Sequence, residues 1–218
     1  MSQTYGKTRW KRFALVMVPS IAATAAIGVG LANNALAASF SVSGQQFKVT
    51  AGDLDGKNFA QYGSVDFQDN SNHKGAHPVA VSAFDSATIH HLCQSVKTDL
   101  PFGLGTWVLR LQAGDGQTPV EATNLMIGLD SLNADATFDN GSPDTDHVTP
   151  GINIGQDAST LPGNAKGQAG AFGQAAPHAH LTNVQQTAWS TSAGTFKLAG
   201  LQLHVHQLDG SQNGSECF

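Results

Sequence analysis

Two His-x-His pairs are the residues whose type and spacing could do chemistry in this chain. They are His178 with His180, and His204 with His206. Because residues i and i+2 of a strand share a face, each pair could present two imidazole rings to one Zn²⁺ ion. A zinc site needs three or four ligands, so the two pairs would have to meet in space.

The same spacing also fits an ordinary strand without a ligand. Apolar residues alternate with the histidines, Ala179 and Leu181 in one pair and Leu203 and Val205 in the other. In a strand with one buried face, these apolar residues point to the core and the histidines point to solvent. We expect this arrangement and keep the four histidines as secondary metal candidates. The sequence predicts neither a bound metal nor another cofactor.

Serine-based ester hydrolysis has no motif in this sequence. The nucleophile elbow Gly-x-Ser-x-Gly is absent, and so is the alternation of strands and helices on which that motif is built. A serine, a histidine and an acid that are distant in sequence could still converge, because triads are recognised by geometry. No catalytic residue is predicted, and a lipid ester hydrolase remains the alternative function.

Cys93 and Cys217 are the only two cysteines. An even number of cysteines in an exported chain favours a disulfide over a reactive thiol or a metal ligand, and neither cysteine belongs to a Cys-x-x-Cys motif. We predict that the two residues are paired.

Alternation of apolar and polar residues after residue 38 predicts an all-β domain of mostly antiparallel strands. A sandwich, a curved sheet or an open β-groove would all fit this pattern. The candidate strands are 39–49, 60–67, 79–84, 87–96, 106–113, 120–127, 132–138, 179–190 and 195–207.

Several candidate strands share a break in their alternation. Two aliphatic residues are separated by two others at 89–92, 129–132, 181–184 and 198–201. The apolar residues thereby change from even-numbered to odd-numbered positions, or the reverse. A one-residue change of parity requires a bulge or a corner. We therefore predict that these strands bend there.

Two tryptophans are expected in or near the core. Trp107 alternates with Leu109 and Leu111, which predicts a buried face for all three. Trp189 stands among small and polar residues and must bury its ring or cover the edge of the core.

Residues 139–177 differ from the rest of the chain. They are rich in Gly, Pro, Asn and Asp and contain few aliphatic residues. This composition predicts a long irregular loop or a partly disordered insertion in the β domain.

The first 37 residues predict a secretory signal. Four basic residues (Lys7, Arg9, Lys11 and Arg12) precede an uncharged apolar run that ends in Ala35-Leu36-Ala37, a signal-peptidase pattern. An uncleaved membrane anchor is the alternative, because the run is close to the roughly 20 residues that span a bilayer. The β domain would then be 38–218, secreted or attached to the cell envelope.

The charge of this domain excludes nucleic acid as a partner. Seven of the eleven Lys and Arg residues remain after residue 37, against sixteen Asp and Glu, a net charge of −9 with neutral histidines. Nucleic-acid binding rests largely on basic residues that neutralise phosphates, and no basic cluster remains.

Several short segments together resemble an actinobacterial secreted family of unknown function. They are TRWKRF (8–13), VPS (18–20), FSVSGQQFK (40–48), FAQYG (59–63), LCQS (92–95), QTAW (186–189) and ECF (216–218). Members of that family are often labelled cholesterol esterase, and their genes often lie beside that of a small multi-pass membrane protein. The resemblance implies an envelope setting, with a membrane protein or a lipid as partner. It supplies no catalytic residues.

Taken together, the sequence favours a non-enzymatic envelope or secreted protein with a structural, assembly or lipid-handling role. An apolar pocket open to solvent would favour a lipid ligand, whereas a filled core would not.

Overall fold

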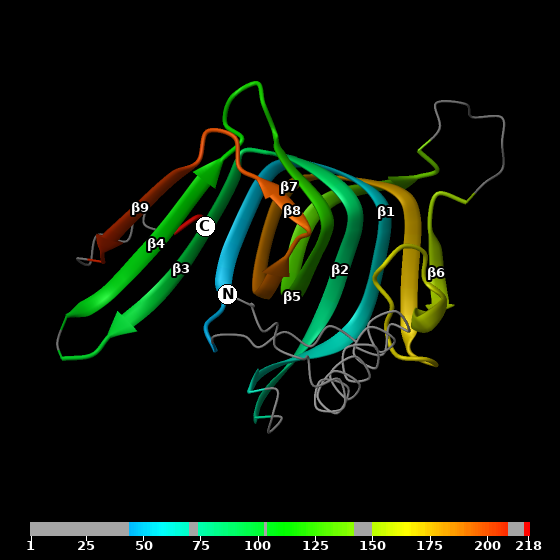
Figure 1. The fold of residues 1–218 in the computed structure, drawn as a ribbon, viewed down its shortest axis with the longest axis horizontal. Coiled ribbons are helices and arrows are strands. Elements are labelled where there is room, and N and C mark those ends of the chain that lie inside the picture. Colours follow the sequence, from blue (N-terminus) through cyan, green and yellow to red (C-terminus); the bar gives the residue numbers. More distant parts are fainter. Residues whose placement is uncertain (1–43, 70–73, 103, 142–149, 209–215) are drawn as a thin grey trace, which may run out of the picture. The chain divides into compact units, whose positions relative to one another are not determined.

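The computed structural model describes residues 44–69, 74–102, 104–141, 150–208 and 216–218 (Figure 1). The predicted signal segment, 1–37, lies outside this part of the chain. No helix among the described residues is long and apolar enough to cross a membrane. The elements are β1 (Phe47–Asp69), β2 (Lys74–His90), β3 (Leu92–Leu100), β4 (Gly105–Ala113), β5 (Val120–Asp139), β6 (Asn153–Asp157), the 3₁₀ helix η1 (Ala158–Thr160), β7 (Phe172–Ser192), β8 (Thr195–Lys197) and β9 (Gln202–Gln207).

Four long strands close on themselves. β1 pairs with β2, β2 with β5, β5 with β7, and β7 returns to β1, and every pairing is antiparallel. We call β1, β2, β5 and β7 the four-strand ring; they curve together in Figure 1. The predicted all-β fold of antiparallel strands is confirmed. Among the three architectures that fit the sequence, the structure has the single curved sheet.

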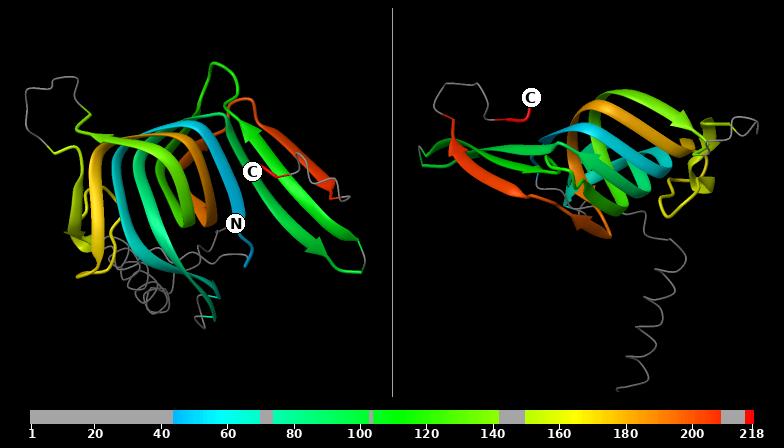
Figure 2. Two further views of the ribbon diagram at one scale, coloured as in Figure 1. Left: turned by 180° about the vertical axis from the view of Figure 1, so that it is seen from behind. Right: turned by 90° about the horizontal axis from the view of Figure 1, so that it is seen from above.

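Three further strands extend the sheet from one end of β1. β3 pairs with the beginning of β1, β4 pairs with β3, and β9 pairs with β4. We call β3, β4 and β9 the arm; Figure 2 shows them running side by side away from the ring. β6 pairs with β7 on the side away from the arm, and β8 pairs with the first residues of β5.

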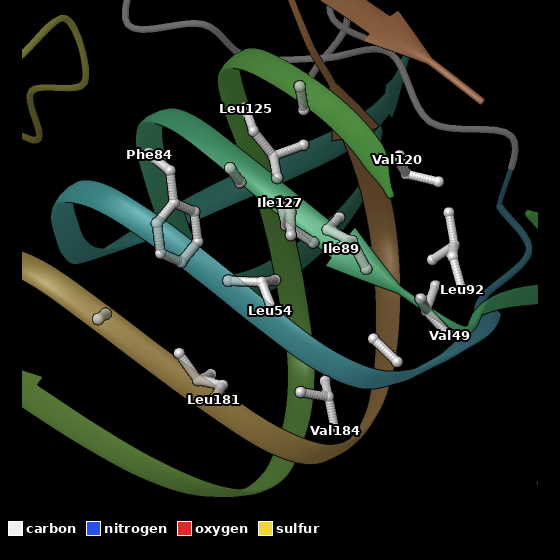
Figure 3. Packing of buried hydrophobic residues seen from close by; sticks show 14 of the residues in the cluster. Val49, Leu54, Phe84, Ile89, Leu92, Val120, Leu125, Ile127, Leu181 and Val184 are labelled. Atoms are coloured by element: carbon white, nitrogen blue, oxygen red, sulfur yellow. The ribbon is translucent and has the colours of Figure 1, made fainter. Parts of the chain in front are cut away.

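The main core fills the inside of the four-strand ring (Figure 3). Each ring strand contributes inward aliphatic residues, such as Leu54 from β1, Ile89 from β2, Leu125 from β5 and Val184 from β7. All four are 5% exposed or less. Because side chains alternate along a strand, the residues between them face outward and are mostly polar.

The predicted corners are confirmed. His91, Asn183 and Gly200 have positive φ angles of 53°, 54° and 66°. Each is the third residue of one of the four segments in which the alternation breaks, 89–92, 181–184 and 198–201. In the remaining segment, 129–132, the register of β5 against β7 shifts between Leu129 and Ser131. At 89–92 and 181–184 the bend keeps an aliphatic residue on the core side before and after it, whereas Leu132 and Leu201, which follow the other two breaks, are 40% and 49% exposed.

Adjacent strands in the sequence prediction are fused in the structure. The candidate 60–67 lies within β1, which includes only the last three residues of the candidate 39–49, and 120–127 and 132–138 belong to β5. The glycines and asparagines between them mark bends within a strand. Asn58 is an example, with a φ of 54°.

The prediction of an irregular loop at 139–177 is wrong over its second half. This range contains β6, η1 and the start of β7, while 142–149 lie outside the described residues. Leu161 and Ala158 are 1% and 0% exposed and pack with Tyr62 in a second apolar cluster. Asp157 caps η1 by accepting a hydrogen bond from the Ser159 amide at 2.9 Å. A few well-placed small apolar residues therefore order a segment whose composition looks irregular.

The predicted orientation of β4 is also wrong. Val108 is fully buried, whereas Trp107 is half-buried and Leu109 is 38% exposed. The Trp107 indole N–H donates to the Leu104 carbonyl at 2.8 Å. The strand is where the sequence places it, but its larger apolar side chains are on the more open side. Trp189 is half-buried and stacks on His77 with ring centroids 3.6 Å apart.

Candidate functional site

His178 joins three strands through two carboxylates. From β7, its Nε2 lies 2.7 Å from an oxygen of Asp55 on β1, and its Nδ1 lies 3.0 Å from an oxygen of Asp139 on β5. Two residues further along β7, the Nε2 of His180 hydrogen-bonds to Asp53 of β1. We call these five residues the His–Asp cluster.

Strand register explains how this cluster forms. β7 lies between β1 and β5, and its position 178 is opposite Lys57 on β1 and Asp139 on β5. His180 is opposite Asp55, so each histidine reaches the carboxylate one step diagonally along β1. The Asp-x-Asp of β1 and the His-x-His of β7 face the same way because both follow the two-residue period of a strand.

The contacts of the cluster change the pKa of two of its members, His178 and Asp139. Burial of the His178 ring opposes protonation, but its hydrogen bonds to Asp55 and Asp139 outweigh this and raise the pKa of His178 above its usual 6.5. The pKa of Asp139 is lowered, first by a hydrogen bond from the Gly141 amide and then by the hydrogen bond from His178. The side chain of His178 is 20% exposed. Near neutral pH this arrangement favours a protonated imidazole between two carboxylates.

This geometry provides a charged cross-strand bridge. A doubly hydrogen-bonded imidazolium has no lone pair for a metal, and its role is to hold β1, β7 and β5 together. Within the described part of the chain, no group of three or more His, Cys, Asp or Glu side chains is arranged to hold a metal ion.

We expect the free energy of unfolding to fall as the pH rises from 6 to 8. A pKa raised by folding stabilises the protein below the unfolded value of 6.5, and this stabilisation is lost as the pH rises through the folded pKa. Because both carboxylates are more than 40% exposed, the loss should be about 1 kcal/mol. Urea unfolding of the protein and of its His178→Gln variant across this range measures the difference. A gap between the two proteins that does not change with pH would contradict the prediction.

At acidic pH, the free energy of unfolding is expected to change with pH in the opposite direction. A pKa lowered by folding, as for Asp139, stabilises the protein above the usual value of 3.8, and this contribution is lost as the pH falls through the folded pKa. The cluster therefore contributes most between about pH 4 and 6.5.

The other predicted histidines are not part of this cluster. His204 and His206 lie on β9, the last strand of the arm, and pair across to Arg110 and Val108 of β4. The expectation that Leu203 and Val205 form a core face is wrong, since they are 55% and 57% exposed. β9 is mostly exposed on both sides because it pairs with β4 alone and, among the described residues, no second layer covers it.

One side of the arm forms an apolar surface, which we call the apolar side of the arm. Facing residues run across it in three rows: Val96, Leu109 and Val205; Gln94, Leu111 and Leu203; Thr98, Trp107 and Gln207. At its tip, Phe102 is 97% exposed and Leu104 is 54% exposed. None of these residues is charged, so this side of the arm is suited to an apolar partner.

No serine hydroxyl of the described residues is hydrogen-bonded to a histidine. Ser190 of β7 instead donates to Asp66 of β1 at 2.7 Å, where Asp66 is 2% exposed. A Cβ on Gly128 would lie 2.5 Å from both partners, so this close three-strand contact requires glycine. The pair is a buried structural contact and lacks the base of a triad.

The two aspartates that β1 contributes to the cluster are the functional residues that sequence reasoning missed. Asp53 and Asp55 form an Asp-x-Asp pair, the same two-residue signal that marks the histidines, but they precede His178 by more than 120 residues. Only the closure of β7 onto β1 brings the two patterns together.

Comparison with known proteins gives a family and no function. No curated protein and no solved structure matches the chain. Residues 43–218 match the model described as Family of unknown function (DUF6230). The match covers nearly all described residues, from before β1 to Phe218, and the chain belongs to this family of unknown function.

Proposed function

We propose that this protein is exported and acts as a non-enzymatic envelope protein that attaches to a lipid surface through the apolar side of its arm. The basic and apolar residues of 1–37 and the Cys93–Cys217 disulfide support export. The observation that carries the attachment is the gathering of exposed apolar residues on the arm.

The exposed large apolar residues are unevenly distributed. Most of those described lie on the arm or next to it: Leu100, Phe102, Leu104, Leu109, Leu201, Leu203 and Val205. A soluble protein rarely exposes a contiguous patch of this kind unless it binds another protein or a membrane. Phe102 at the tip and Trp107 behind it are the residue types that enter the interface of a bilayer.

Attachment at a surface fits the structure better than a lipid held inside the ring. The free space among the core residues, bounded by Val49, Ile89, Ile127 and Val184, is about 30 Å³, room for only a few water molecules. Small-molecule pockets have volumes of about 300–1,000 Å³. An acyl chain would therefore have to contact the outside of the protein.

The charges of the arm favour the same orientation. Lys97 and Arg110 alternate with the residues of the apolar side and point to the opposite side of the sheet. Since residues 38–218 carry a net charge of −9, we expect a neutral lipid surface to bind better than an anionic one.

We expect the purified protein to sediment with phosphatidylcholine vesicles, and the double variant Phe102→Ser, Val205→Ser to lose at least tenfold in binding. The two substitutions remove side chains that are 97% and 57% exposed, so the fold should be unaffected. Co-sedimentation over a range of lipid concentrations measures the change.

The control replaces matched side chains away from the arm. Ile154→Ser with Phe172→Ser also removes one β-branched aliphatic side chain and one phenylalanine, which are 67% and 60% exposed on β6 and β7, and should leave binding intact. Equal loss in both variants, or no binding by the unaltered protein, contradicts the proposal. If sedimentation equilibrium shows a dimer that is lost only in the arm variant, the apolar side of the arm binds a second copy of the chain, and the proposal of lipid attachment is overturned.

A further inference from the structure

A cavity of about 280 Å³ lies beside the start of β7, away from the arm. β6 and η1 form one wall, and the corner of β1 at Asn58 and the first residues of β7 form the rest. Its lining residues are Asn58, Asn153, Gln156, Thr160, Pro162, Ala175, Ala176 and Pro177. Its volume is near the lower end of small-molecule pockets, so it can hold a ligand about the size of one ring.

Three residues of the wall, Asn58, Thr160 and Gln156, present hydrogen-bond acceptors, and the carboxamide of Asn153 can donate or accept. The Nδ2 of Asn58 already donates to Asp85 at 2.8 Å, which leaves its Oδ1 to accept. The hydroxyl of Thr160 donates to the Asp157 carbonyl at 2.8 Å, so its oxygen can also accept. A ligand that satisfies this wall must therefore donate hydrogen bonds.

Gln156 is a third acceptor, and it has no partner. Its Oε1 is buried and makes no hydrogen bond. A buried carbonyl oxygen without a hydrogen bond is unfavourable, so a small rotation of the amide toward a ligand donor gains a bond that the side chain lacks.

The remaining lining residues exclude charged ligands. No charged side chain lines the cavity, so an anion would lose its hydration without gaining a counter-charge. A cation would lose water without contacting a carboxylate, which is unfavourable. Two prolines and two alanines offer flat apolar surface to C–H groups.

We propose that this cavity binds one neutral sugar ring. The hydroxyl groups of the sugar donate to Asn58, Gln156 and Thr160, and its C–H faces contact Pro162, Pro177 and the two alanines. This site is separate from lipid attachment by the arm and does not depend on it.

The test uses the purified full chain with glucose and N-acetylglucosamine as probes, with saturation-transfer NMR titrations as the readout. We expect saturable binding of at least one probe, and weaker or no binding of glucose 6-phosphate and glucosamine. Gln156→Leu should weaken binding about tenfold, the effect of one lost hydrogen bond. Thr160→Trp should abolish binding, because Thr160 is exposed at the cavity and a large ring there would fill it.

The matched control is Gln185→Leu, the same substitution at an exposed position of β7 outside the cavity, which should bind normally. Thermal unfolding of all three variants checks that they fold. The proposal is overturned if neither neutral sugar binds, if the charged sugars bind better, or if Gln156→Leu and Thr160→Trp bind like the control.

Discussion

Replacing both Cys93 and Cys217 with serine is expected to lower the free energy of unfolding by about 3–5 kcal/mol. The disulfide joins residues 124 positions apart, and so closes a loop that includes the whole arm after Cys93 and the strands β5 to β9. In the chain-entropy model, a cross-link over so long a loop greatly restricts the unfolded chain. Urea unfolding of the oxidised protein and the double variant measures the difference.

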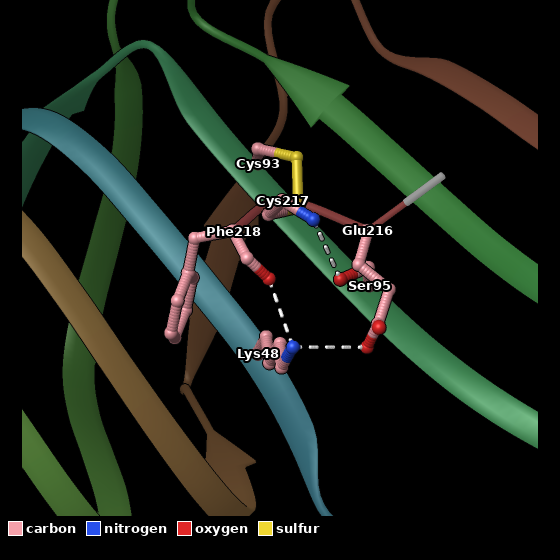
Figure 4. Close-up of a disulfide and its surroundings, with 6 residues drawn as sticks. All are labelled: Lys48, Cys93, Ser95, Glu216, Cys217 and Phe218. Atoms are coloured by element: carbon pink, nitrogen blue, oxygen red, sulfur yellow. Dashed lines mark hydrogen bonds and ion pairs between the residues drawn. A yellow bond between two sulfur atoms is a disulfide. The ribbon is translucent and has the colours of Figure 1, made fainter. Parts of the chain in front are cut away.

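The disulfide also holds residues 216–218 against the sheet (Figure 4). The Cys217 amide donates to Ser95 at 3.0 Å, and Lys48 contacts both the Phe218 carbonyl oxygen at 2.8 Å and Glu216 at 3.3 Å. Lys48→Ala removes the last two contacts while keeping the disulfide. Because they are partly exposed, we expect this control to cost no more than about 1 kcal/mol. Equal effects of the two changes would mean that the polar contacts, and not the covalent link, hold the segment.

Replacing Phe84 with alanine is expected to lower the free energy of unfolding by about 3–5 kcal/mol, the usual cost of removing a buried phenyl ring. Phe84 is 4% exposed inside the four-strand ring, and its ring centroid lies 5.4 Å from that of Phe59. Phe172→Ala is the matched control, because Phe172 is 60% exposed and its loss should change stability by less than about 0.5 kcal/mol.

A second variant tests why Phe84 fits. A Cβ on Gly56 would lie 2.3 Å from the Phe84 ring, so Gly56→Ala should cost about 1–3 kcal/mol by overpacking. In the Phe84→Ala background the same substitution should cost much less, because the ring that it meets is gone. Additive costs in thermal or urea unfolding would show that Gly56 and Phe84 do not contact each other as described.

Local pattern determined a large part of this fold. The two-residue alternation predicts strands, and the aliphatic steps at 89–92, 181–184 and 198–201 predict corners where His91, Asn183 and Gly200 have positive φ. These features are readable because a strand's faces and a bend's backbone depend on residues close in sequence. Strand ends were less readable, since the same small residues mark a bend within β1 and a turn between two strands.

The orientation of the arm shows where local pattern fails. Leu109 and Val205 belong to the same apolar–polar alternation that marks the core strands, yet they are 38% and 57% exposed. Val108 is buried instead. Which face of a strand is covered depends on what packs against it, and for β4 and β9 the sequence nearby carries no information on that.

The His–Asp cluster depended wholly on the tertiary structure. The sequence by itself determined that Asp53 and Asp55 share one face of a strand, and that His178 and His180 share a face of another. It could not determine that the two faces adjoin, because strand order and register across more than 120 residues are set by closure of β7 onto β1 around a common core. That closure places each imidazole beside a carboxylate, and so joins two surface patterns into one cross-strand cluster in which the pKa of His178 is raised.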